Sequence, residues 1–318
     1  MKTKLAKFLV SAVVAVAVPA SAGAQVIGLG TTKGGATAQV AAAISKVVTT
    51  KSDIQMRTQA MGGTQQYIPI VNAGELPFGL SNMPQYWMAW TGTGLSEGKK
   101  YDNLRIVATM MVFRVGAVVA AKSDIRKASD FRGKRIPFGF NAAPLFNYVV
   151  GSMLANGDVS YDNVTKVPAV GLPQHWGMFK EGKLDLAVVA VGTGVLQEMN
   201  AVIDGGIRYV SLDPSDPATK RTVAVYPGSY LKQVQPAKGL VGVMEPVYTL
   251  HFDYLLWAHK DVKDDVVYKV VKAMYDNEAD LKATSPLWRS HASKTMAKEQ
   301  GAPYHPGALK FYKEAGLR

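Results

Sequence analysis

One pattern occurs twice along the chain: a short apolar strand, a loop of small polar residues and a helix, repeated once and closed by a third strand. The first copy has strands at 26–29, 54–58 and 76–80, and the second at 135–138, 164–167 and 186–190. Gly28 and Gly79 are 51 positions apart, as are Gly139 and Ala190. Strands connected through helices run parallel, so the pattern predicts two doubly wound α/β lobes.

The six strand-to-helix loops are built from small and polar residues, beginning with the stretch GLGTTKGG at 28–35. Glycine lets the backbone approach a ligand closely, and a helix start presents free N–H groups that suit an anion. In open parallel sheets, ligands bind outside the carboxyl ends of the strands. We therefore predict a cleft between the lobes. The predicted ligand-binding residues are Thr31, Thr32, Gly34, Gly35, Thr37, Met61, Gly62, Gly63, Thr64, Ser81, Asn82, Phe113, Arg114, Asn141, Ala142, Ala143, Gln174, Gly192 and Thr193.

The connections between the lobes are predicted from two further stretches. The segment 104–121, LRIVATMMVFRVGAVVAA, is interpreted as two buried strands with a crossing at 113–116. The segment 213–246 holds five prolines and little periodicity, and we expect the second crossing near its end. A strand at 248–258 and an amphipathic helix at 261–275 follow, and the tail is expected to pack on the first lobe. This gives lobe I as 25–115 plus 247–318, and lobe II as 116–246.

Arg114 is the only charge in the interior of that apolar stretch, since Arg105 lies at its beginning. A buried guanidinium is costly unless it is paired. One interpretation is a salt bridge to a carboxylate of the protein. The other is a bidentate clamp on a ligand carboxylate, which the geometry of the guanidinium suits. Both interpretations remain open from the sequence.

The first 24 residues have the organisation of a secretory signal peptide. Lysines 2, 4 and 7 precede the apolar run 8–18, and Ala22-Gly23-Ala24 fits the small-x-small cleavage pattern. The apolar run is shorter than the roughly 20 residues that a membrane-spanning helix needs. Cleavage after Ala24 would leave 294 residues and lower the net charge from +12 to +9, because three lysines are lost. We expect an exported, periplasmic protein.

The chain lacks the usual signatures of catalysis. It has no cysteine, no Gly-x-Ser-x-Gly motif, and no closely spaced pair among its five histidines. Lys33 stands where a dinucleotide fingerprint needs its third glycine. Ser81 and Thr193 are therefore interpreted as hydrogen-bond donors. The basic residues are scattered, unlike those of a nucleic-acid-binding face. We predict a binding protein with no catalytic residue, cofactor or metal, and no nucleic-acid partner.

Several segments resemble a known family. They are Ile27-Gly28-Leu29-Gly30 with Gly34-Gly35, then Met61-Gly62-Gly63-Thr64, the run NAGEL at 72–76, the run ASDFRGKR at 128–135 and the run KEGKLD at 180–185. Over nearly all of the mature chain, the sequence is similar to the TAXI-type solute receptors of TRAP transporters. The resemblance implies a type II periplasmic binding protein fold, whose two lobes are joined by a two-strand hinge.

The resemblance also implies a function. Such a receptor captures a small solute, here an anionic organic acid or acidic amino acid, and delivers it to a TRAP membrane permease. Closure of the lobes around the ligand would be the mechanism, because the ligand contacts both lobes only in the closed state. Two alternatives remain: the binding protein of an ABC importer, and a secreted sensory ligand-binding protein. We expect a monomer.

Overall fold

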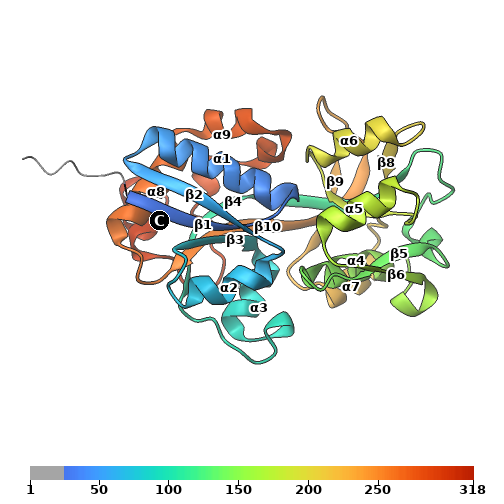
Figure 1. The fold of residues 1–318 in the computed structure, drawn as a ribbon, viewed down its shortest axis with the longest axis horizontal. Coiled ribbons are helices and arrows are strands. Elements are labelled where there is room, and N and C mark those ends of the chain that lie inside the picture. Colours follow the sequence, from blue (N-terminus) through green and yellow to red (C-terminus); the bar gives the residue numbers. More distant parts are fainter. Residues whose placement is uncertain (1–24) are drawn as a thin grey trace, which may run out of the picture.

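The computed structural model describes residues 25–318, and the predicted signal peptide lies outside this range. Two lobes lie side by side (Figure 1). Two long strands, β4 (Leu104–Ala120) and β10 (Val247–His259), run through both of them. The two lobes therefore share one mixed sheet, in which the strand order is β2-β1-β3-β10-β4-β7.

Lobe I follows the predicted first copy of the pattern. Strand β1 (Gln25–Thr32) pairs in parallel with β2 (Ile54–Met61) and β3 (Phe78–Asn82), and β10 runs antiparallel to β3. The helices of this lobe are α1 (Gly35–Lys51), α2 (Thr64–Asn72), α3 (Met83–Thr91), α8 (Asp264–Asp276), α9 (Glu278–Thr284) and α10 (Pro306–Glu314), with short 3-10 helices η1 (Gly94–Ser96), η4 (Pro286–Ser290) and η5 (Ser293–Thr295).

Lobe II departs from the prediction of a second parallel three-stranded sheet. Only β5 (Arg135–Gly139) and β6 (Thr165–Ala169) pair in parallel. Strands β7 (Ala187–Ala190) and β8 (Ile207–Tyr209) pair antiparallel with β4. The reason is that β4 continues into this lobe and its backbone groups need partners. The helices of lobe II are η2 (Ala128–Phe131), α4 (Leu145–Asn156), η3 (Tyr161–Asn163), α5 (Leu172–Lys180), α6 (Val195–Val202) and α7 (Asp216–Val225).

The segment predicted as two strands is one continuous strand, β4, because no proline or turn interrupts its run of β-forming residues. Gly116 does not break it, since the ring of Tyr209 fills the space beside that glycine. Strand β4 pairs with β10 so that Phe113 is opposite Phe252 and Arg114 is opposite His251. Two bulges interrupt this ladder, because Met110 and Val107 lie between paired positions of β4.

The proline-rich segment also holds more regular structure than predicted. It contains α7 and strand β9 (Tyr230–Val234), which is antiparallel to the beginning of β10. Pro217 lies in the first turn of α7, where its missing N–H costs no helix hydrogen bond. A count of prolines therefore underestimated the order of this segment.

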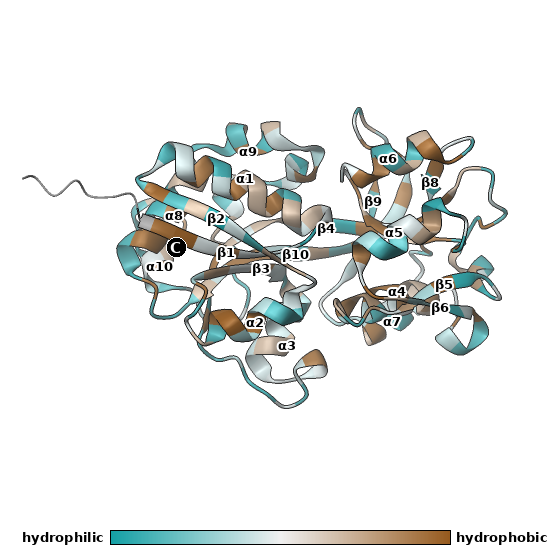
Figure 2. Cartoon of the chain, in the orientation of Figure 1, coloured by the Kyte–Doolittle hydropathy of each residue, from teal (hydrophilic) through white to brown (hydrophobic). Residues whose placement is uncertain are grey.

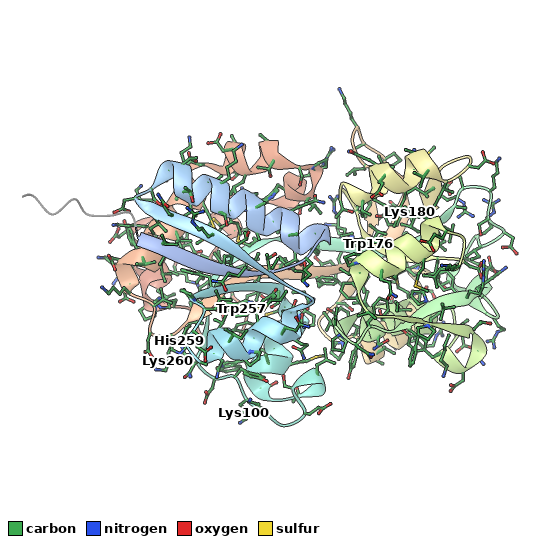
Figure 3. All side chains as sticks on the ribbon, viewed as in Figure 1. Lys100, Trp176, Lys180, Trp257, His259 and Lys260 are labelled. Carbon is green, nitrogen blue, oxygen red and sulfur yellow. The ribbon has the colours of Figure 1, made fainter. Side chains whose placement is uncertain are left out.

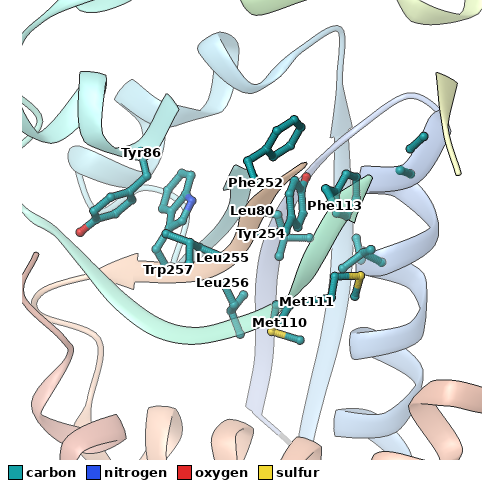
Figure 4. Packing of buried hydrophobic residues seen from close by; sticks show 14 of the residues in the cluster. Leu80, Tyr86, Met110, Met111, Phe113, Phe252, Tyr254, Leu255, Leu256 and Trp257 are labelled. Carbon is teal, nitrogen blue, oxygen red and sulfur yellow. The ribbon is translucent and has the colours of Figure 1, made fainter. Parts of the chain in front are cut away.

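The core of lobe I lies between the sheet and its helices. Trp257 of β10 is fully buried, and its ring lies beside those of Tyr67 and Tyr86. Figure 4 shows Trp257 with Tyr86. Figure 2 shows hydrophilic residues on outer helices such as α9 and hydrophobic residues on strands such as β1. The tail packs on lobe I as predicted, and the hydroxyl of Tyr312 donates to the carbonyl of Val107 at 2.8 Å. Within residues 25–318, none of the helices has the length and apolar character to cross a membrane.

Candidate functional site

A cavity of about 70 Å³ lies between the two lobes, with room for about five water-sized spheres. All six strand-to-helix loops reach it, as the sequence predicts, and the two hinge strands form one wall. The lining residues are Thr32, Lys33, Gly34, Ala36, Thr37, Gly62, Gly63, Thr64, Asn82, Gln85, Phe113, Val115, Ala143, Leu145, Phe146, Val149, Leu172, Pro173, Trp176, Val188, Ala190, Thr193, Phe252 and Tyr254.

The first two loops are held by their own hydrogen bonds. The hydroxyl of Thr32 donates to the carbonyl of Gly34 at 2.7 Å, and the N–H of Lys33 donates to the carbonyl of Met61 at 2.8 Å. In the second loop, the side chain of Gln66 accepts from the N–H of Gly62 at 2.8 Å. These contacts fix the backbone at the ends of β1 and β2 without using the Thr37 or Thr64 hydroxyl.

Four helices begin at the cavity, and no side chain accepts a hydrogen bond from their first N–H groups. The residues before α1, α2, α4 and α5 are Gly34, Gly63, Pro144 and Gly171, and none makes a side-chain cap. The first N–H groups of a helix have no partner within the helix, and its N-terminus carries a partial positive charge. The cavity is therefore bordered by four helix ends that favour a negative or strongly polar group.

Aromatic side chains of the hinge strands form one wall of the cavity. The rings of Phe113 and Tyr254 stack with centroids 4.1 Å apart, and Phe252 lies beside Phe113 at 6.2 Å (Figure 4). The hydroxyl of Tyr254 shares a hydrogen bond of 2.5 Å with the hydroxyl of Thr37. Burial raises the pKa of Tyr254 well above its usual value, so this group is a neutral phenol at any physiological pH.

The lining of the cavity combines apolar residues with hydroxyl and amide groups and carries little charge. Lys33 is the single charged residue of the lining, and its side chain is exposed at the edge of the cavity. Hydroxyl and amide groups come from Thr32, Thr37, Thr64, Asn82, Gln85, Thr193 and Tyr254. Such a site suits a small molecule with one polar or anionic end and an apolar remainder.

The lobes are in contact across this cavity. A Cβ atom placed on Gly63 of lobe I would lie 1.9 Å from the carbonyl oxygen of Ala142 in lobe II. Likewise, a Cβ on Gly35 would lie 2.7 Å from the ring of Trp176, which is labelled on α5 in Figure 3. The structure is therefore in a closed conformation, in which glycines allow the lobes to meet.

Ten of the nineteen predicted ligand-binding residues line the cavity. They are Thr32, Gly34, Thr37, Gly62, Gly63, Thr64, Asn82, Phe113, Ala143 and Thr193. They come from lobe I, from lobe II and from β4, so the structure brings residues far apart in the sequence to one place. Contact with a ligand stays a prediction for each of them.

The other nine lie outside the lining. Ser81 accepts a hydrogen bond of 2.9 Å from the indole of Trp257, and the side chain of Gln174 accepts one of 2.5 Å from the N–H of Val170. Arg114 faces away from the cavity, because it alternates along β4 with Phe113 and Val115. The remaining six are Thr31, Gly35, Met61, Asn141, Ala142 and Gly192. The structure supplies no partner for Arg114 under either interpretation. Within residues 25–318, Arg114 takes part in no ion pair, and its Nη2 atom has no hydrogen-bond partner.

Sequence reasoning missed the apolar half of the lining. Phe252 and Tyr254 lie on the predicted strand 248–258, for which no ligand-binding residue was predicted, and Trp176 is a buried aromatic that also packs against Gly35. The signal was the alternation of β10 opposite β4, which places Phe252 and Tyr254 on the same face as Phe113. This signal can be recognised only when the pairing between β4 and β10, which are distant in the sequence, is known.

The chain belongs to the NMT1-like family, whose model matches residues 28–316. It is similar in structure to the periplasmic binding protein BugD, with 12% identity, a TM-score of 0.55, and coverage of 92% of this chain and 98% of that one. It is also similar to PhnD1 from Prochlorococcus marinus in complex with methylphosphonate, with 10% identity, a TM-score of 0.54, and coverage of 92% and 99%.

A third similar structure is a binding component of an ABC phosphonate transporter from Pseudomonas aeruginosa. It has 9% identity and a TM-score of 0.51, and the match covers 82% of this chain and 78% of that one. These similarities confirm the predicted fold, an α/β periplasmic binding protein of type II. At 9–12% identity, these structures show the fold of the chain.

Proposed function

We propose that the protein is the extracytoplasmic receptor of an importer, and that it closes its two lobes on a small solute with an anionic end. The observation that carries this proposal is the cavity between the lobes, to which all six strand-to-helix loops contribute. The lobes meet around it through Gly63 and Ala142, as expected for a receptor that encloses its ligand.

The class of solute follows from the groups that border the cavity. Four uncapped helix N-termini favour an anion, whereas the aromatic wall of Phe113 and Tyr254 favours an apolar body. No arginine lines the cavity to clamp a carboxylate with two parallel bonds. A compact oxyanion on a short alkyl group fits this lining: a phosphonate, a sulfonate or a short carboxylate.

We propose an ABC-type permease as the partner in the membrane. Two of the similar structures are named for phosphonate, and one of them is a component of an ABC transporter. The TRAP permease implied by the resemblance of the sequence is the second candidate, favoured by the Ile27-Gly28-Leu29-Gly30 segment with Gly34-Gly35. Export by the segment 1–24 would place the protein in the periplasm, where either permease can receive the solute.

Thermal-shift screening of the purified exported protein tests the solute class. The panel contains methylphosphonate, short alkanesulfonates, short carboxylates, acidic amino acids and neutral sugars. We expect a concentration-dependent rise in melting temperature with one of the small oxyanions, because a ligand that binds only the folded state stabilises it. A rise with a neutral sugar alone would overturn the proposed solute class.

The permease is tested separately, with the solute found in the screen. The loaded receptor is added to proteoliposomes that hold the candidate permease encoded beside its gene. ATP-dependent uptake identifies an ABC importer, and uptake driven by a sodium gradient identifies a TRAP transporter. Absence of uptake with either energy source would leave the protein as a sensory receptor and overturn the importer proposal.

A further inference from the structure

The hinge strands have a second pocket on the face opposite the cavity. This pocket has a volume of about 350 Å³. Because side chains alternate along a strand, Phe113 and Phe252 point to the cavity while Arg114 and His251 point to the other face. Basic and polar residues from the four elements β4, β9, β10 and η4 line it, among them Arg114, Tyr230, Lys232, His251, Arg289 and Ser290. We call this the hinge pocket.

Arg114 lies in the hinge pocket without a partner. Its Nη2 atom is fully buried and has no hydrogen-bond acceptor within residues 25–318. Burial lowers the pKa of Arg114, and the nearby Arg289 lowers it further, because both disfavour the charged form. A guanidinium stays protonated in any protein, so Arg114 keeps its charge in the hinge pocket at a cost in desolvation free energy. The Arg114 side chain is half-buried with one fully buried nitrogen, and a guanidinium without a partner attracts an anion that can reach it.

The lining of the hinge pocket has one sign of charge. It has three cations, Arg114, Lys232 and Arg289, and no carboxylate among its lining residues. Only one oxygen of the nearby Asp253 is engaged: Oδ2 accepts from Lys298 at 2.6 Å and from Gln300 at 2.9 Å, whereas Oδ1 is buried without a partner within residues 25–318. The pocket therefore concentrates positive charge next to a desolvated donor.

His251 adds a neutral group to this lining. Burial first, and then the charge of Arg114, lower the pKa of His251 to about 4. It is therefore uncharged near neutral pH and adds no repulsion between cations. Its ring nitrogen Nε2 shares a hydrogen bond of 3.1 Å with the hydroxyl of Thr249, which holds the ring in place.

The hinge pocket is bounded by both lobes. Lys232 belongs to β9 in lobe II, whereas Arg289 belongs to η4, which packs on lobe I. The two sides already touch, because Arg289 donates to the carbonyl of Lys238 at 2.6 Å. Pro286 of η4 also lies against Gly192 and Gly239 of lobe II. An anion held by Arg114, Lys232 and Arg289 would add an electrostatic connection between the lobes behind the hinge.

We propose that the hinge pocket is a second binding site, for a small oxyanion of the sulfate or phosphate class, and that its occupant stabilises the closed conformation. This site is distinct from the proposed solute site, because the two open on opposite faces of β4 and β10. Arg114 supplies the desolvated donor, and the exposed side chains of Lys232 and Arg289 close over the ion from lobe II and lobe I. The closed conformation thereby gains affinity for anions that the open one lacks.

Titration calorimetry with sodium sulfate tests the site, in sodium chloride adjusted to constant ionic strength. We expect one saturable sulfate site per protein. Arg114→Gln and Lys232→Gln should each weaken sulfate binding about tenfold or more, because each removes a charge-assisted contact. Lys313→Gln is the matched control, since it removes an equal charge from the exposed face of α10 and should leave binding unchanged.

Thermal unfolding separates a binding role of Arg114 from a purely structural one. If the role of Arg114 is to bind an anion, its unpaired charge destabilises the protein without sulfate, so Arg114→Gln should raise the melting temperature under that condition. Sulfate should raise the melting temperature of the wild type but not that of the variant. X-ray scattering should show that sulfate makes the wild type more compact. The proposal fails if sulfate does not saturate, if Lys313→Gln weakens it equally, or if Arg114→Gln only lowers the melting temperature. Saturable binding without compaction would refute the role in closure.

Discussion

Replacing Gly63 by alanine should impair ligand binding by preventing closure. The backbone of Gly63 has φ −168°, an extended conformation that any residue adopts, so alanine adds no local strain. Its Cβ would instead meet the Ala142 carbonyl oxygen of the other lobe at 1.9 Å. Restoring an ordinary contact of 3.4 Å requires the lobes to separate there by about 1.5 Å.

The size of the effect follows from that displacement. A ligand hydrogen bond of about 2.9 Å that is lengthened by this amount is broken. Loss of two neutral hydrogen bonds from lobe II, at about 1 kcal/mol each, would cost about 2 kcal/mol. The affinity should then fall about thirtyfold, with the melting temperature of the ligand-free protein unchanged. Calorimetry with the solute found by screening measures the affinity.

Gly171→Ala is the matched control. Gly171 is also the residue before a helix at the cavity and also has an extended backbone, with φ −171°. A Cβ there would meet its nearest neighbours at 3.8 Å and 4.0 Å, which is ordinary contact. Binding should therefore be unaffected. Unchanged affinity of the Gly63→Ala variant, or an equal loss in both variants, would refute the argument that closure depends on this contact.

Three other predictions concern the cavity, the pH dependence and export. Tyr254→Phe removes the hydrogen bond to Thr37 and should weaken solute binding about fivefold in calorimetry, at about 1 kcal/mol for a neutral bond; a gain in affinity would contradict the site. Burial lowers the pKa of His175 from 6.5 to about 4, so the unfolded chain takes up this proton first as the pH falls. The urea unfolding free energy should therefore decrease by up to about 3 kcal/mol from pH 7 to pH 4, and by less in His175→Gln; equal slopes would exclude His175 as the cause. Amino-terminal sequencing of the exported protein should begin at Gln25, and a sequence beginning at Met1 would contradict cleavage.

Local patterns predicted most of lobe I and the loops around the cavity. Each strand-to-helix transition is encoded within about ten residues, as in the run from Val26 to Gly35, so the sequence alone reveals it. The same holds for α8, where Val266, Val270 and Val271 form one apolar stripe. These elements owe their positions to periodicity and glycine, which require no knowledge of distant segments.

The errors concern pairing between distant segments. Whether 104–120 is one strand or two depends on β10, more than a hundred residues later, which supplies a continuous partner. The role of Arg114 depends on the same pairing, because the face of β4 on which it lies is set by the register with His251. The aromatic wall was missed for this reason too, and the partners of β7 depend on how far β4 extends.

The two bulges of β4 make its length critical. Met110 and Val107 are each an additional residue on β4 relative to β10. Each of them moves the side chains that follow it to the opposite face of the sheet. Two such residues restore the original alternation, so Phe113 reaches the cavity and Arg114 the hinge pocket. Deleting either one would send a guanidinium into the apolar cavity and an aromatic ring to the rear. Insertions and deletions in this strand should therefore be tolerated only in pairs.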